Sequence, residues 1–227
     1  PMDTKNGIVR KAVNLPGWVN IPLRDRIQSA FGIPANLEND ANAAAYAEYW
    51  KGAGQNACLM IAYTLGTGVG GGIIIEGKLI RGTNDCAGEL GHMTIVPDGD
   101  PCACGNRGCL ESYASANSLV RRAMAKIKSG AQTILRQWID EGKPLTSKLI
   151  DEARLAGDSF SRDAMIEAGT YLGLGMSAVV SALNPDIIVV GGGMMKAGEV
   201  LLEPARVEVK RRVFAEHFAK LKILPAR

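Results

Sequence analysis

One stretch of the sequence gathers side chains that bind metal ions. The residues from Glu89 to Glu111 include three of the five cysteines and one of the two histidines of the chain. Thiolates and an imidazole are the ligands that zinc prefers in a tetrahedral site. The sequence therefore predicts a zinc site, whose ligands would be His92, Cys102, Cys104 and Cys109.

The spacing of these cysteines indicates how such a loop could close. Cys102 and Cys104 are one residue apart, so in an extended chain both sulfurs point to the same side. Gly105 and Gly108 allow a tight turn that returns the third cysteine to the first two. Ordinary buried thiols or a disulfide are the alternative, but an odd and clustered set favours a metal. An iron–sulfur cluster would need Cys86 as a fourth thiolate and ranks lower.

A second candidate for chemistry lies at Asn39 and Asp40. We expect a short strand over residues 34–38 and an alanine-rich helix over residues 43–50, ended by Gly52. Asp40 or Asn39 could cap this helix by accepting hydrogen bonds from free backbone amides. Asp40 could instead be a catalytic base at the end of a strand, where α/β folds place their chemistry. The residues alone leave both interpretations open.

Two glycine-rich turns could hold phosphate. The first, Gly66-Thr67-Gly68, lies between strands expected over residues 57–64 and 73–75. A nicotinamide-binding glycine motif needs a helix after it, so we exclude that cofactor. A hairpin can instead present backbone amides and the Thr67 hydroxyl to phosphate oxygens, unless its glycines serve packing alone. The second turn, residues 191–193, follows a buried strand at 186–190 and opens a helix over about 197–214, as in nucleotide sites.

The other expected elements are mostly helices. Apolar spacing predicts helices over residues 22–31, 111–128, 133–140, 147–156 and 156–183, and a strand over 221–224. Glycines cost stability inside a helix. Gly169, Gly173 and Gly175 in the long helix therefore indicate that another backbone packs close to it.

Composition limits the class of protein. The chain has 227 residues, of which 47% are hydrophobic and 22% are charged, as in a soluble globular protein. A net charge of +3 is too small to indicate a nucleic-acid or acidic-membrane partner. We see no apolar run near the roughly 20 residues that cross a bilayer, and no signal peptide. We therefore expect a cytoplasmic protein with reduced cysteines.

Taken in order, the motifs resemble one family. The sequence reads Asn-Leu-Pro-Gly-Trp from residue 14, Glu-Asn-Asp-Ala-Asn from 38, Leu-Gly-Thr-Gly-x-Gly-Gly-Gly from 65, Glu-x-Gly-His from 89, Cys-x-Cys-Gly-x-x-Gly-Cys-x-Glu from 102 and Val-Val-Gly-Gly-Gly from 189. Together they resemble the ROK family of bacterial sugar kinases and sugar-responsive repressors, in particular its ATP-dependent glucokinases. The resemblance covers nearly the whole chain.

The resemblance implies an α/β fold of the actin-like (ribonuclease H-like) ATPase type, with sugar and ATP in a cleft between two domains. Residues 1–54 would be a remnant of the N-terminal small domain. Residues 55–227 would form the C-terminal large domain, with a zinc loop at 92–109. The zinc would be structural and would order the sugar site.

The resemblance also implies a role for each motif. Asp40 would be the general base that takes the proton of the sugar hydroxyl as it attacks the γ-phosphate of ATP. The sugar would be held by Asn14, Asn39, Asp40, Glu89, His92 and Glu111, and the phosphates of ATP by Gly66, Thr67 and Gly68, with Gly192 and Gly193 near the nucleoside. The expected function is the transfer of phosphate from magnesium-bound ATP to a hexose, glucose to glucose 6-phosphate, at the entry to glycolysis. The expected partners are hexose, ATP and a second copy in a homodimer.

A sugar-responsive transcriptional repressor of the same family is the alternative function. The intact Asp40 and both glycine turns favour the kinase, since a repressor must bind sugar but need not transfer phosphate.

One feature of the family is missing. Family members begin with a strand and an Asp-x-Gly-Gly-Thr-type loop that binds phosphate and helps to place magnesium, and this sequence contains no such loop. We therefore expect a fragment that lacks the N-terminal phosphate loop and the C-terminal end, and that has little or no kinase activity by itself.

Overall fold

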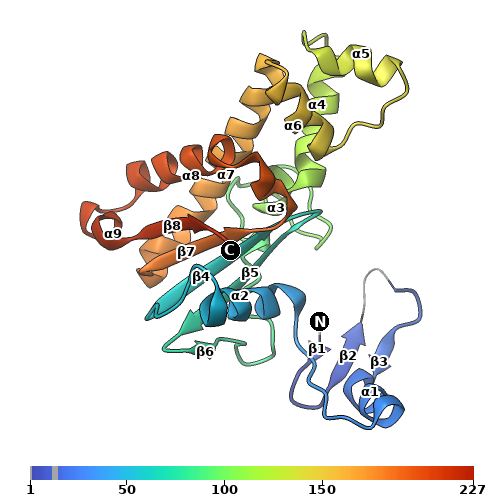
Figure 1. The fold of residues 1–227 in the computed structure, drawn as a ribbon, viewed down its shortest axis with the longest axis vertical. Coiled ribbons are helices and arrows are strands. Elements are labelled where there is room, and N and C mark those ends of the chain that lie inside the picture. The colour runs from blue at the N-terminus through green and yellow to red at the C-terminus, as the bar shows by residue number, and fades with distance from the viewer. Residues whose placement is uncertain (1, 12–14) are drawn as a thin grey trace.

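A computed structural model describes residues 2–11 and 15–227 of the chain. Its N-terminal part is a small antiparallel sheet of order β1-β2-β3, formed by β1 (Met2–Asp3), β2 (Ile8–Lys11) and β3 (Val19–Ile21). Helix α1 (Leu23–Phe31) packs beside β2 and ends at Gly32 in the left-handed conformation, as predicted. In Figure 1 this unit lies at the lower right, beside the rest of the chain.

A five-stranded mixed sheet of order β6-β5-β4-β7-β8 forms the centre of the larger part. Its strands are β4 (Leu59–Leu65), β5 (Val69–Ile75), β6 (Lys78–Leu79), β7 (Ile187–Gly191) and β8 (Lys222–Pro225). Strand β4 is antiparallel to β5 and parallel to β7. The strands predicted for this sheet are confirmed, but β5 begins four residues earlier than expected (Val69 rather than Ile73), so the glycine run lies within the sheet.

Helices cover both faces of this sheet (Figure 1). Helices α7 (Ser159–Leu183) and α8 (Glu199–Arg212) lie on one face, and α2 (Asp40–Lys51) packs against β4 and β5 on the other. The two faces of β4 separate the two cores, because Ile61, Tyr63 and Leu65 join one cluster and Met60 joins the other. The remaining elements are α3 (Glu111–Ala114), α4 (Ala116–Lys128), α5 (Ile134–Asp140), α6 (Ser147–Leu155), α9 (Ala215–Lys220) and the short 3₁₀ helices η1 (Leu90–His92) and η2 (Gly193–Ala197).

The glycines of α7 confirm the predicted close approach of another backbone. A Cβ atom on Gly173 would lie 2.5 Å from the carbonyl oxygen of Ala205, and one on Gly169 would lie 2.1 Å from that of Leu201, both in α8. Gly175 instead faces the side chain of Leu110. The two helices therefore pack with their backbones nearly in contact.

Helix α7 is also long and apolar enough, by length and composition, to cross a membrane. The expectation that no segment approaches a membrane span was wrong by this measure. Half of the apolar window is buried inside the protein, where α7 packs against α8. We therefore describe α7 as the core helix of the larger part.

Two other predicted elements differ from the structure. Residues 34–38 do not form a strand and run as an irregular segment to the start of α2. The helix expected over residues 111–128 is divided at Ser115, whose backbone is extended (φ −79°, ψ 163°). The Ser115 hydroxyl oxygen accepts a hydrogen bond from the amide of Ser118, so this residue ends α3 and caps α4.

Asp158 joins the starts of two helices. Its carboxylate accepts hydrogen bonds from the amide and hydroxyl of Ser161 in α7 (2.9 and 2.6 Å) and from the hydroxyl of Thr133 before α5 (2.8 Å). Burial alone would raise the pKa of Asp158, but these hydrogen bonds outweigh it and hold the pKa below its usual value.

We predict that Asp158→Ala lowers the free energy of unfolding by about 1–2 kcal/mol at neutral pH, as the loss of a helix cap does. The folded pKa lies below the unfolded value of about 3.9, so the ionised carboxylate stabilises the fold above that pH. This contribution is lost as the pH falls through the folded pKa. Urea unfolding over a pH series measures the difference. Asp163→Ala, which changes an exposed aspartate of the same helix, should have little effect at any pH. A difference that stays constant in acid would contradict this assignment.

Candidate active site

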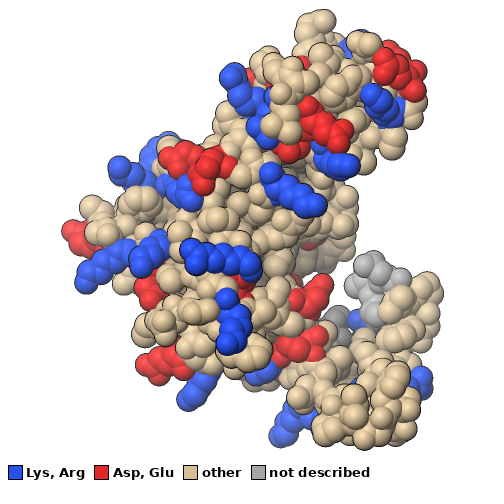
Figure 2. Space-filling model, in the orientation of Figure 1, with Lys and Arg blue, Asp and Glu red and all other residues tan. Residues whose placement is uncertain are grey.

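A cleft of about 680 Å³ opens between the start of α2, the β4–β5 turn and the segment that leads into η1. Figure 2 shows the molecule hollowed between the N-terminal sheet and the larger part, with acidic side chains near the edge. Most of the residues predicted to bind sugar or nucleotide line this cleft: Asn39, Asp40, Gly66, Thr67, Gly68, Glu89, His92, Glu111 and Gly192. Gly193 follows this lining at the start of η2. Asn14 lies outside the described residues.

The start of α2 settles which residue caps the helix. The side-chain oxygen of Asn39 accepts hydrogen bonds from the amides of Ala41 (2.9 Å) and Asn42 (3.1 Å), so Asn39 is the cap. Asp40 is the first helical residue, and one of its oxygens accepts from the amide of Ala41 (2.9 Å). The first turn of a helix favours a negative charge. Since Asn39 caps the helix and Asp40 uses only one oxygen for the amide of Ala41, the second carboxylate oxygen of Asp40 is available to a ligand in the cleft.

Strand β5 lies between the two walls of the cleft. A Cβ atom on Gly72 would lie 2.5 Å from the Cβ of Ala45, so α2 rests directly on one face of the strand. A Cβ atom on Gly71 would lie 2.6 Å from the carbonyl oxygen of Gly88, on the segment that leads into η1 and packs on the other face. These glycines of the motif therefore serve packing.

The turn between β4 and β5 differs from the strand that follows it. Its backbone closes between Gly66 and Gly68, where the Gly66 amide donates to the Gly68 carbonyl (3.0 Å), and no atom lies within 4 Å of a Cβ built on Gly66. One carboxylate oxygen of Glu111 accepts from the amide of Val69 (2.9 Å). This bond holds the Glu111 side chain beside the turn, inside the cleft. The first glycines of the motif therefore form an open turn, whereas Gly71 and Gly72 lie in the strand and serve packing.

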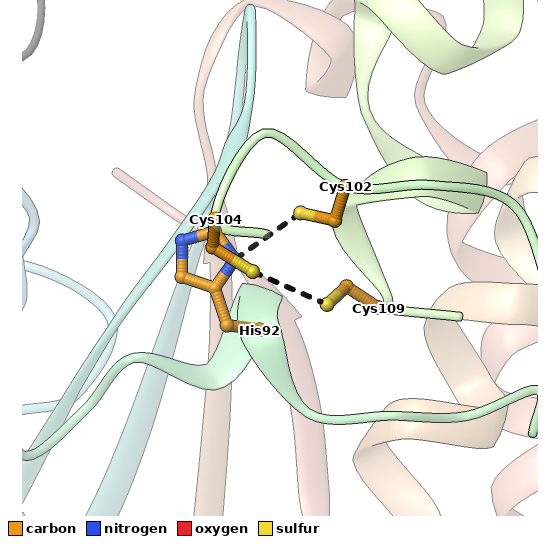
Figure 3. A group of neighbouring side chains, drawn as sticks. All are labelled: His92, Cys102, Cys104 and Cys109. Carbon is orange, nitrogen blue, oxygen red and sulfur yellow. Dashed lines mark hydrogen bonds between the residues drawn. The ribbon is translucent and has the colours of Figure 1, made fainter. Parts of the chain in front are cut away.

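The four predicted metal ligands converge (Figure 3). Their ligand atoms all lie within 4.8 Å of one another, with 3.7 Å between the sulfurs of Cys104 and Cys109 and 3.6 Å from the sulfur of Cys102 to Nδ1 of His92. Around zinc, with bonds of about 2.3 Å to sulfur and about 2.0 Å to nitrogen, neighbouring ligand atoms of a tetrahedron lie roughly 3.5–3.8 Å apart. The donor set and its dimensions therefore fit zinc.

The conformation that gathers the cysteines is not the expected one. The amide of Gly105 donates to the carbonyl of Cys102 (3.0 Å), so a tight turn, and not an extended chain, brings Cys102 and Cys104 together. Gly105 and Gly108 have positive φ angles of 93° and 73°, as the predicted turn requires.

The surroundings of the cluster give its members different properties. A hydrogen bond from the backbone of Asn106 lowers the pKa of Cys104. Burial raises the pKa of Cys109 to about 12. His92 turns Nδ1 toward the thiols, while its Nε2 lies 3.9 Å from a carboxylate oxygen of Glu89. A metal would therefore take Nδ1 and leave Nε2 to face Glu89 in the cleft.

Residues 1–227 match the model of the ROK family. The chain belongs to the ROK family. It is 43% identical to a glucokinase of Halalkalibacterium halodurans over 206 residues. This aligned region covers 90% of this chain and 62% of the relative. A xylose repressor of Caldicellulosiruptor bescii is 36% identical over 222 residues, which is 98% of this chain and 55% of that protein. The chain thus spans less than two thirds of the length of these two relatives.

A solved structure from the same family is similar throughout. The ROK glucokinase of Streptomyces griseus in complex with glucose and AMPPNP superposes with a TM-score of 0.88 at 38% identity, over 99% of this chain and 73% of that one. The predicted α/β fold of the actin-like ATPase type is therefore confirmed for this member of the ROK family.

Sequence reasoning missed one wall of the cleft. This wall is lined by Asp85, Cys86, Ala87 and Gly88. The sequence suggests Cys86 only as a thiolate of an iron–sulfur cluster, and the other three residues lie in an irregular stretch between two motifs. Their position follows from the packing of Gly88 on β5, which no spacing rule reports.

We predict that the purified protein binds one zinc ion per chain and that Cys104→Ser removes most of it, because the site loses one of four ligands. Elemental analysis after dialysis measures the metal. Cys58→Ser, at an exposed cysteine outside the cluster, is the control and should keep the zinc. Equal zinc contents in the two variants would exclude the cluster as the site.

We also predict that Gly72→Ala lowers the free energy of unfolding by about 1–3 kcal/mol, because the added methyl group forces α2 away from the sheet. Gly193→Ala adds the same group where no atom lies within 4 Å and should cost much less. Urea unfolding compares the two variants. A Gly72→Ala protein as stable as the wild type would show that α2 can move at no cost.

Proposed function

We propose that the full-length protein is an ATP-dependent hexose kinase that converts glucose to glucose 6-phosphate. The observation that carries the proposal is the position of Asp40 in the same cleft as the turn at Gly66–Gly68. A carboxylate that can accept the proton of a hydroxyl then lines the same cleft as backbone amides that can hold a phosphate. Similarity to glucokinases supports glucose as the substrate.

The sugar would be held by hydrogen-bond donors and acceptors that complement its hydroxyl groups. Asn39 uses its oxygen in the helix cap, so its amide nitrogen is the group that would donate to a sugar oxygen. Glu89 and Glu111 would accept hydrogen bonds from sugar hydroxyls. His92 would contribute Nε2. The carboxylate of Asp40 would take the proton of the attacking hydroxyl.

The phosphates would lie on the other side of the cleft. At the turn Gly66–Gly68, where the Gly66 amide is already bonded within the turn, the amides of Thr67 and Gly68 and the hydroxyl of Thr67 would bind phosphate oxygens. Gly192 and Gly193 would lie near the nucleoside. Magnesium bound with ATP would neutralise charge on the transferred phosphate. Zinc at the cysteine cluster would hold the loop at residues 92–109 in shape and so order His92 and Glu111.

Other features of the whole protein stay predictions. They are the division into domains at residue 54, the homodimer, the cytoplasmic location and the lack of activity of the fragment.

Sugar-dependent transcriptional repression is the second candidate function. The similarity to a xylose repressor over 98% of the chain favours it. A repressor needs the sugar half of the cleft but no base aimed at a transferred phosphate. The two functions therefore differ in turnover and not in sugar binding.

We predict that the full-length protein releases ADP from magnesium-ATP in the presence of glucose and that Asp40→Asn lowers kcat by about 10²–10⁴-fold, the usual contribution of a general base. A coupled assay measures turnover over a panel of hexoses, and calorimetry measures sugar affinity, which Asp40→Asn should largely keep.

Asp163→Asn, on the exposed surface of α7, is the matched control. Glucose binding without turnover in the wild type would instead support the repressor. Undiminished turnover in Asp40→Asn would remove Asp40 from the mechanism.

A further inference from the structure

Both carboxylate oxygens of Glu38, the residue before Asn39, have hydrogen-bond partners. One oxygen of Glu38 accepts hydrogen bonds from the amide of Asn39 (2.9 Å) and from the side-chain nitrogen of Asn42 (3.2 Å). The other oxygen pairs with Arg81, whose Nε and Nη2 lie 2.8 and 2.7 Å away. Such a two-pronged pair fixes direction as well as distance.

Arg81 begins the segment that forms the missed wall of the cleft. We call residues 81–88 the wall loop. Its ends are held together by a hydrogen bond from the amide of Ala87 to the carbonyl of Arg81 (2.9 Å). In its middle, the carboxylate of Asp85 accepts from the amide of Thr4 in the N-terminal part (2.8 Å). The wall loop therefore contacts the N-terminal part, the start of α2 and the cleft.

The Glu38–Arg81 pair joins this loop to the turn that carries the proposed base. The Glu38 carboxylate accepts hydrogen bonds from the backbone amide of Asn39 and from the side chain of Asn42. Asn42 is buried (4% exposed) in the first turn of α2. Asn39 in turn caps the helix at whose first position Asp40 stands. A shift of Glu38 would therefore pass to Asp40 through two hydrogen-bonded neighbours.

Stability alone does not explain this arrangement. The side chains of Glu38 and Arg81 are 20% and 44% exposed, and ion pairs that accessible contribute little to folding. The pair matters more for the position of the two segments than for stability. It connects segments that are 43 residues apart in the sequence, and both of these segments contribute residues to the lining of one cleft.

We propose that Glu38 is a positioning residue: paired with Arg81, it holds the Asp40 turn and the wall loop in one arrangement, so that base and wall enclose the hexose together. This inference rests on the proposed kinase function. Positions of reacting groups must be kept within a fraction of an ångström, and a misplacement of about 1 Å can cost about a hundredfold in rate.

The test uses the full-length protein and the variant Glu38→Gln. Glutamine keeps an oxygen for Asn39 and Asn42 but turns an amide toward Arg81, which breaks the pair. We expect kcat with glucose to fall about tenfold to a hundredfold, while KM for ATP changes less than twofold. The double variant Glu38→Gln/Arg81→Gln should lose no more activity than Glu38→Gln alone, because the two side chains act as one unit.

Asp151→Asn is the matched control. It removes the charge from another partly buried pair, Asp151 with Arg154 (2.7 Å, both side chains 19% exposed), in α6 and outside the cleft. Both single variants should show similar small shifts in melting temperature, but only Glu38→Gln should lose kcat. A kcat of Glu38→Gln within twofold of the wild type, or a loss shared with Asp151→Asn, would overturn the positioning role.

Failure of the kinase proposal would be visible separately, as a wild type that turns over no hexose. The positioning role is then decided by calorimetry with glucose and xylose. A tenfold weaker affinity in Glu38→Gln than in Asp151→Asn for the sugar that the wild type binds would support it. Equal affinities, or a wild type that binds neither sugar, would reject it.

Discussion

The cleft depends on a strand that lacks side chains where two other segments must touch it. Gly72 lets α2 rest on one face of β5, and Gly71 lets the segment at Gly88 rest on the other. Since packed interiors leave no room for added atoms, any side chain at these positions would separate a wall of the cleft from the sheet. Asp40 and His92, on segments that are far apart in the sequence, are therefore placed by their contact with one strand.

A second connection runs from the cysteine cluster to the turn of the same hairpin. Glu111 follows two residues after Cys109, and its carboxylate accepts the amide of Val69 at the start of β5. The other oxygen of Glu111 lies 4.0 Å from the sulfur of Cys102. A metal bound by the cluster would fix the loop that carries Glu111, and so would help to fix the position of the Glu111 carboxylate in the cleft. A metal bound there would influence ligand binding indirectly, without a part in the chemistry.

At the start of α2, two neighbouring polar residues have different contacts. The single side-chain oxygen of Asn39 accepts from two backbone amides, whereas Asp40 uses one of its two carboxylate oxygens for the amide of Ala41. Asn39 takes the capping task, and the next residue, Asp40, lies in the cleft with its carboxylate. The names of the glucokinase and the xylose repressor indicate that ROK proteins have different functions. They can nevertheless share this arrangement, because a fold and its cleft do not by themselves decide function.

The sequence by itself was sufficient to predict which side chains gather as possible metal ligands, most strands and helices, and the family. Cysteine and histidine have few other reasons to cluster, and glycine turns and apolar spacing are local signals that report local structure. The tertiary structure decided the rest. It assigned the cap to Asn39 and not to Asp40, replaced an extended segment at Cys102 by a turn, and left residues 34–38 without a strand. It also brought Arg81 to Glu38 and the wall loop to the cleft. Those outcomes depend on which distant backbone approaches a given residue, and such contacts follow from packing across the sheet, which the spacing of residues along a chain does not record.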